Sequence, residues 1–173
     1  MSEQRLPDAK VLLLDLLDES YNRFAWHGPN LTQALRGVDA TQANWRPSSA
    51  EAMPWNIAEI VRHVEDVMRH CGFSLLGRSG GPFLGEIQRT FPLPDLLDEV
   101  WTNVIGLLDE SYNLLRQAVS ETTLARLAEM SRGYERDWTF FNFVYGVAFH
   151  NVYHAAQIVS LRKRQGTWTE WQP

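Results

Sequence analysis

The sequence predicts an all-α protein, a four-helix bundle with long connections and short additional helices. Four long segments carry apolar residues at the spacing of a helix, and no segment shows the apolar–polar alternation of a strand meander. Glycine and proline occur in the stretches between these segments. A count of four long helices favours a four-helix bundle. The length of 173 residues fits a single domain, residues 1–173, which is large enough to bury a core.

The first long helix is predicted to begin after Pro7. Asp8 is the expected N-cap, and apolar residues recur from Val11 to Phe24. The connection that follows is long for a simple bundle, and it leaves room for short helices near residues 30–36 and 40–45.

The second and third long helices are separated by another long connection. The second is predicted to run from near Pro54 to the stretch between Gly72 and Gly77. The third is predicted to start near Pro94 and to carry apolar residues as far as Val119.

The fourth helix is predicted from about Trp138 to Gln165, with Gly166 as its end. Its apolar residues lie on most sides, as expected of a central helix. The connection before it covers about residues 121–137.

One heptapeptide, Leu-Leu-Asp-Glu-Ser-Tyr-Asn, occurs twice, ending at Asn22 and at Asn113. Both copies fall in predicted helices. One short match does not establish a repeat architecture. The interpretation is similar chemistry on two helix surfaces.

Composition excludes several classes of protein. The net charge of −5 gives no basic surface for nucleic acid. No apolar stretch reaches the roughly 18 residues of a membrane span, and the N-terminal residues lack the apolar region of a signal peptide. The single cysteine, Cys71, rules out an internal disulfide and suits a reducing cytoplasm, where we expect the protein to be. Cys71 lies on an apolar stripe and is interpreted as a core residue.

His150 and His154 are the most informative pair of residues. They lie four apart in a run without glycine or proline, so on a helix both imidazoles leave the same face, roughly 6 Å apart along the axis. Such a pair can share one metal ion. The alternative is two packed histidines, each hydrogen-bonded to a neighbour.

A third ligand has three candidates, His27, His63 and His70. His63 lies at the edge of the apolar stripe of the second helix and can face a neighbouring helix. His70 follows two turns later, roughly 10 Å along the axis, so a compact site can use only one of these two.

At these residues the chain resembles the DinB / YfiT-like superfamily. The resemblance is carried by the tryptophan-headed segment that ends at Glu59–His63, by the run His150–Gln157 and by Trp26–Pro29. It covers nearly the whole chain in motif order. The run His150–Gln157 departs from the family pattern at Ala155 and Ala156, where the family often has a glycine next to the glutamine.

The resemblance implies a four-helix bundle that holds one divalent metal ion through His63, His150 and His154. It also implies a homodimer, and it favours Gln157 as a residue that orients a ligand imidazole. Asn151, Glu59 and Tyr153 are the other candidates for that role. His27 matches a position in one branch of the family. The resemblance implies that this position lies next to the site, and it gives the residue no role.

Three neutral imidazoles without a fourth strong protein ligand leave coordination positions open, as in catalytic rather than structural zinc sites. A water molecule held there can be acidified toward neutral pH. Imidazole ligands suit zinc, nickel, iron or copper, so the metal stays unnamed. A general base is not obvious. Glu59, one turn before His63, is the one candidate, although a glutamate at a helix start is usually solvated.

The leading hypothesis is therefore a metal-dependent enzyme that acts on a small molecule, either a hydrolase or a transferase of low-molecular-weight thiols. The two reaction types come from the resemblance. The alternative is a non-catalytic metal-binding or ligand-binding stress-response protein. A third hypothesis is a structural bundle whose histidines bind metal only opportunistically.

Overall fold

The computed structural model describes residues 8–47, 55–78, 97–131 and 138–169, and every regular element within these ranges is a helix. The all-α prediction is therefore confirmed. The helices are α1 Ala9–Tyr21, α2 Leu31–Leu35, α3 Ala40–Asn44, α4 Ile57–Leu75, α5 Asp98–Glu121, α6 Leu124–Ala128 and α7 Phe140–Gln165. Within the described part of the chain, no helix is both long enough and apolar enough to cross a membrane.

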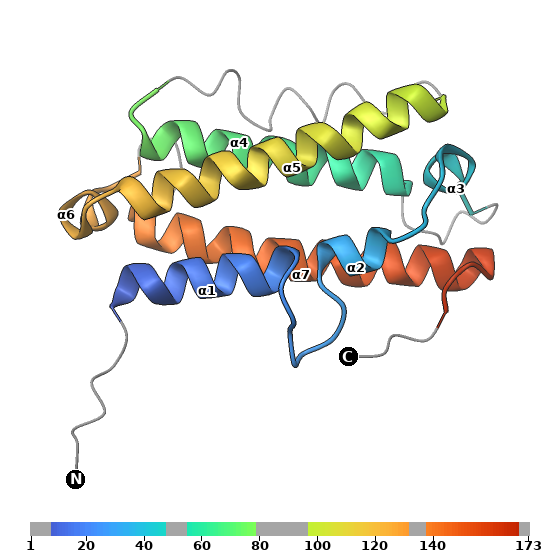
Figure 1. Cartoon of the computed structure of the whole chain (residues 1–173), viewed down its shortest axis with the longest axis horizontal. Helices are drawn as coiled ribbons and strands as arrows, with labels where there is room; N and C mark the ends of the chain where they lie inside the picture. The colour runs from blue at the N-terminus through green and yellow to red at the C-terminus, as the bar shows by residue number, and fades with distance from the viewer. Residues whose placement is uncertain (1–7, 48–54, 79–96, 132–137, 170–173) are drawn as a thin grey trace, which may run out of the picture.

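The long helices α1, α4, α5 and α7 pack side by side. α1 and α2 follow one another along α7, while α4 and α5 lie together on the other side of the molecule (Figure 1). α4 and α5 run in one direction, and α1 and α7 run in the other (Figure 1). Their apolar faces meet in one core, which removes apolar surface from water. The fully buried side chains include Leu13, Leu17, Ile57, Ile60, Met68, Leu108, Leu115, Ile158 and Leu161.

Side-chain caps define where the helices begin and end. Asp8 accepts a hydrogen bond from the Lys10 amide and starts α1, as predicted. Asn56 and Thr139 form capping boxes at the starts of α4 and α7. Gly166, with φ of 71°, ends α7 as predicted, in the left-handed conformation that glycine adopts without strain.

Two features of the fold differ from the sequence-based expectation. The first helix was expected to include Phe24, but α1 ends at Tyr21, because the amides of Asn22 and Arg23 both bond to the Asp18 carbonyl. Phe24 is 61% exposed. The connection before α7 contains an unpredicted helix, α6, which has five residues and is too short to show a helical period.

The predicted short helices near residues 30–36 and 40–45 are present as α2 and α3. The predicted start of the third long helix near Pro94 lies outside the described residues, and the first described helical residue of α5 is Asp98.

α4 and α5 approach each other closely at Gly72. A Cβ atom at this position would lie 3.1 Å from Leu114 Cγ and 3.2 Å from the Leu115 Cα atom. These separations are shorter than ordinary van der Waals contact, so a side chain here would push the helices apart. Gly72 thus fixes the position of α4, the helix that carries His63.

The two copies of the heptapeptide contact each other, one from α1 and one from α5. The rings of Tyr21 and Tyr112 stack with centroids 3.9 Å apart. The Tyr112 hydroxyl donates to Asp18 at 2.6 Å, and the Tyr21 hydroxyl donates to Asp109. Both tyrosines are buried, so the repeated residues form a helix–helix contact and not only similar surfaces.

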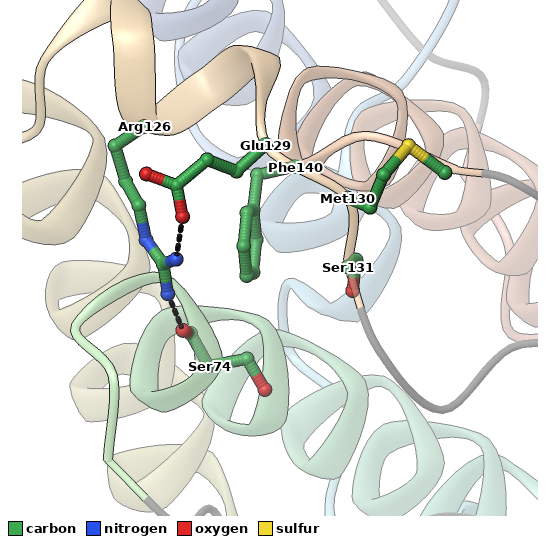
Figure 2. A pocket seen from close by; sticks show the side chains of 6 residues that line it. All are labelled: Ser74, Arg126, Glu129, Met130, Ser131 and Phe140. Carbon is green, nitrogen blue, oxygen red and sulfur yellow. Dashed lines mark hydrogen bonds and ion pairs between the residues drawn. The ribbon is translucent and has the colours of Figure 1, made fainter.

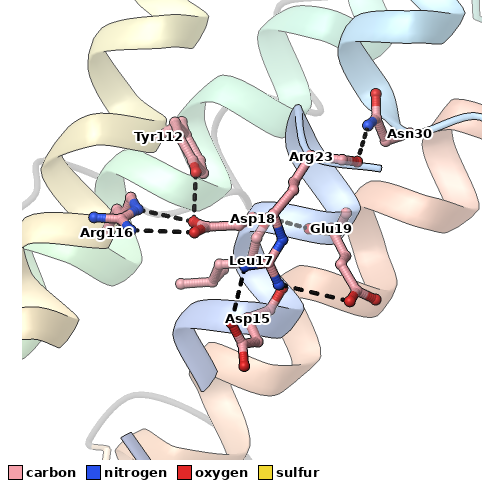
Figure 3. A network of polar contacts seen from close by, with 9 residues as sticks. Asp15, Leu17, Asp18, Glu19, Arg23, Asn30, Tyr112 and Arg116 are labelled. Atoms are coloured by element: carbon pink, nitrogen blue, oxygen red, sulfur yellow. Dashed lines mark hydrogen bonds and ion pairs between the residues drawn. The ribbon is translucent and has the colours of Figure 1, made fainter. Parts of the chain in front are cut away.

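Asp18 also accepts two hydrogen bonds from Arg116, at 2.8 and 3.1 Å (Figure 3). Burial raises the pKa of the Asp18 carboxyl, but hydrogen bonds from Arg116 and Tyr112 outweigh burial and hold it below its usual value. Arg23, two residues after the end of α1, pairs with Asp15 of that helix. The carboxylate of Asp18 thus joins α1 to α5 by three hydrogen bonds.

Candidate metal centre

α4 and α7 bring three histidines together. His63 comes from α4, whereas His150 and His154 lie one turn apart on α7. The Nε2 atom of His150 is 2.9 Å from His63 Nε2 and 3.0 Å from His154 Nε2. All three potential ligand atoms lie within 4.8 Å of one another. The structure therefore places a potential metal-binding group at the three positions that the family resemblance implied.

These three nitrogens fit a single coordination sphere. The Nε2 atom of His150 is 2.9 to 3.0 Å from the other two, and all three ligand atoms lie within 4.8 Å of one another, so they can approach one ion at the zinc–imidazole distance of about 2.0–2.1 Å. Lone pairs aimed at one point repel each other unless a cation or a shared proton lies between them. Among the described residues, no carboxylate or thiol joins the group. The donor set is therefore imidazole alone.

The environment keeps the three rings neutral. Burial, reinforced by His154 and His63, lowers the pKa of His150 to about 3. Burial and His63 lower the pKa of His154 to about 4, against an opposing effect of its hydrogen bond to Gln157. Burial also lowers the pKa of His63. Neutral imidazole is the form that binds a metal ion, so the site needs no proton release from these rings near neutral pH.

Gln157 sets the orientation of His154. The Nδ1–H group of His154 donates to Gln157 Oε1 at 2.7 Å, and Gln157 Nε2 donates to the Tyr153 hydroxyl at 3.0 Å. This arrangement leaves the lone pair of His154 on Nε2, the atom that faces the other two imidazoles. By contrast, the Nδ1 atom of His150 is buried and has no hydrogen-bond partner in the described part of the chain.

Trp55 covers the histidine cluster from the start of α4. Its ring centroid lies 5.1 Å from that of His63 and 6.3 Å from that of His154, nearly parallel to the latter. Trp55 is half-buried, so it shields the imidazoles from water and strengthens the burial effect on their pKa values. The sequence patterns did not assign this residue to the site. Its place directly before the helix cap Asn56 was the available signal.

Glu59, the candidate general base, has both carboxylate oxygens engaged. Oε2 accepts a hydrogen bond from the Asn56 amide at 2.9 Å, and Oε1 pairs with Arg46. The side chain is 1% exposed. Glu59 is therefore the partner of Asn56 in a capping box, and its pair with Arg46 anchors the segment after α3.

The other candidates lie elsewhere. The ring of His70 packs 6.4 Å from Phe143 and does not join the cluster. His27 is exposed in the segment before α2. Cys71 is fully buried, and burial raises the pKa of its thiol, so it is an inert core residue as expected. Asn151 donates to Ser20 on α1 and not to an imidazole.

A family model now places the chain among known proteins. The model that describes the DinB superfamily matches residues 23–158, most of the chain. The chain belongs to the DinB superfamily. The match includes the three clustered histidines and Gln157. No curated protein and no solved structure matches closely enough to add to this assignment.

This DinB protein also has a cavity of about 540 Å³ at the far end of α4 from Trp55 (Figure 2). Its most prominent polar group, Arg126, donates to the carbonyl oxygens of Ser74 and Leu75 at 3.0 and 3.3 Å. Arg126 also pairs with Glu129 and lies 4.1 Å from the centre of the Phe140 ring. The guanidinium is committed to joining α4, α6 and α7, so this cavity is best explained as part of a structural junction.

Proposed function

We propose that this DinB protein is a metal-dependent enzyme that acts on a small molecule. One divalent ion would be held by the Nε2 atoms of His63, His150 and His154. The observation that carries the proposal is the convergence of three neutral imidazoles, in which Nε2 of the half-buried His150 lies 2.9 and 3.0 Å from Nε2 of the buried His63 and His154. Zinc, nickel and iron all suit such a ligand set.

The ligand set supports chemistry more than a structural role. Structural zinc is usually closed by four protein ligands, whereas catalytic zinc has three and keeps a position for water or substrate. A divalent ion here would supply Lewis acidity to a water molecule or a thiol near neutral pH. The proposed reaction is therefore hydrolysis or the transfer of a low-molecular-weight thiol.

Three residues of the chain have distinct tasks in this proposal. Gln157 holds His154 in the tautomer that presents Nε2. Trp55 limits the access of water to the imidazoles. The Tyr153 hydroxyl accepts a hydrogen bond from Gln157 and keeps its own proton, which it can donate to a bound substrate.

A second candidate function is a non-catalytic metal-binding or ligand-binding protein of the stress response. The engagement of both Glu59 oxygens favours it, because this leaves the cluster without an evident carboxylate base. The two functions share the metal and differ in turnover.

The test is a comparison of chelated and metal-reloaded protein on panels of esters and of thiol conjugates. We expect activity to disappear with the chelator and to return with metal. His150→Gln should be inactive, and His70→Gln, which changes a histidine outside the cluster, should keep the parent rate. Turnover at the parent rate by chelated protein or by His150→Gln would refute the metal mechanism. Stoichiometric metal binding without turnover on either panel would favour the second candidate.

A further inference from the structure

A second cavity, of about 350 Å³, lies between the segment before α2 and the outer side of α7. Val152, Ala156 and Val159 of α7 form its apolar wall, and His27 and Lys163 contribute basic groups to its lining. Its size lies in the range of about 300–1,000 Å³ that is usual for small-molecule sites.

The cavity is separate from the histidine cluster although both use α7. Successive residues of a helix turn by about 100°, so Val152 and Ala156 leave α7 on the side roughly opposite to His150 and His154. The clustered imidazoles face α4, whereas the cavity faces residues 27–29. A ligand in the cavity would therefore not touch the proposed metal site.

The lining of the cavity combines apolar surface with positive charge. None of the described residues that line it carries a carboxylate. Among the described residues Lys163 makes no ion pair. The chain as a whole carries a net charge of −5, so acidic residues are in excess, and Lys163 still has no acidic partner among those that the structure describes. A lysine in the last turn of a helix also stabilises the helix dipole. That role explains Lys163 but explains neither the apolar wall nor the imidazole of His27 across from it.

We propose that this cavity binds a small amphiphilic anion, with a carboxylate or phosphate headgroup on a short apolar chain. The headgroup accepts hydrogen bonds from Lys163 Nζ and from a ring N–H group of His27. The apolar chain lies on Val152, Ala156 and Val159 and removes their exposed surface from water. Nearby Trp26, which is 83% exposed and whose ring contacts His27, provides a fluorescent reporter.

The experiment is a calorimetric titration of the full chain with five probes below their micellar concentrations: octanoate, octyl phosphate, octanol, octylamine and acetate. We expect octanoate or octyl phosphate to bind, and the tighter of the two identifies the headgroup. Octanol, octylamine and acetate each lack one required feature and should bind more weakly. Binding of octanol or octylamine as tight as that of both anions, or no binding of either anion, would overturn the proposal.

Variants locate the binding. Lys163→Met should weaken anion binding about fivefold, the size expected of one charge-assisted contact at a partly exposed site. Arg164→Met removes an equal charge at the next position, outside the cavity lining, and should leave binding unchanged. Ala156→Leu fills the cavity and should abolish binding. Equal effects of Lys163→Met and Arg164→Met would refute a specific site. His150→Gln should bind the anion normally, and loss of binding in that variant would move the ligand to the histidine cluster.

Discussion

Tyr21 and Tyr112 stack face to face, and each donates its hydroxyl to the aspartate of the other's heptapeptide, so that two identical segments exchange hydrogen bonds across antiparallel helices. Burial and the facing carboxylates raise the pKa of both phenols, which therefore stay protonated as donors. This exchange joins α1 to α5 and stabilises the contact between these two helices, neither of which carries a histidine of the cluster.

Removal of one of these hydroxyls should destabilise the protein. Tyr112→Phe keeps the stacked ring but removes the donor to Asp18, and we expect the free energy of unfolding to fall by about 1–2 kcal/mol. Urea denaturation measures this change. The control is Tyr145→Phe, because the Tyr145 hydroxyl makes no hydrogen bond within the described ranges and its loss should cost much less. Equal losses for the two variants would mean that the exchanged hydrogen bonds do not stabilise the fold.

Gln157 should tune metal affinity through His154. In Gln157→Leu the Nδ1 atom of His154 loses its acceptor, and we expect metal affinity to fall about 10- to 100-fold. Competition with a chromophoric chelator gives the affinity. Gln117→Leu is the matched control, because Gln117 is exposed on α5 and its side chain, among the described residues, bonds only to Glu121. Unchanged affinity in Gln157→Leu would remove this residue from the support of the site.

The metal-free protein should lose stability in acid. The pKa values of His150 and His154, about 3 and 4, lie below the ordinary value of 6.5, so the unfolded chain takes up protons before the folded chain does. Their contribution to the free energy of unfolding therefore has its full value above pH 6.5 and decreases as the pH falls toward 4. The loss is up to about 1.4 kcal/mol per pH unit for each histidine, less where solvent screens it.

Urea denaturation of chelated protein between pH 7.5 and pH 4.5 measures this dependence. His150→Gln removes one of the two titrating groups, so its stability should fall less steeply with acid. A slope identical to that of the parent would show that His150 is not held neutral by burial.

We also propose that two copies of the chain associate through helix faces. Exposed apolar side chains on three long helices, Leu12 on α1, Leu107 on α5 and Phe149 on α7, give surface that a second copy could cover. Sedimentation at micromolar concentration should give a species of twice the chain mass of 19.9 kDa, which dissociates on dilution. A single species near 19.9 kDa at that concentration would contradict the proposal.

Local sequence signals were sufficient for most of the fold. Apolar periodicity and caps such as Asp8 and Gly166 predicted the long helices, because helix starts and ends depend on nearby residues. The five-residue helix α6 was not predicted, because so short a segment has no readable period; the equally short α2 and α3 were expected only from the length of the connection that contains them. The contact between the heptapeptides also could not be predicted, since it depends on how α1 and α5 pack.

For the site, too, local sequence signals predicted one part and tertiary packing determines the rest. The spacing of His150 and His154 predicted that they share one helix face. The choice of His63 over His70 depends on the register between α4 and α7, which local patterns do not encode, and here it came from the family resemblance. The cover by Trp55 likewise depends on tertiary packing.

The central claim, a metal ion held by three histidines, is tested most directly by elemental analysis of protein loaded with zinc, nickel or iron and then freed of excess ion. The parent chain and His70→Ala should each retain one ion per chain for at least one of these metals, because His70 lies outside the cluster. His63→Ala should retain none, because two imidazoles from one helix make a weak site. Full occupancy in His63→Ala, or no occupancy in the parent with any of the three metals, would contradict this assignment.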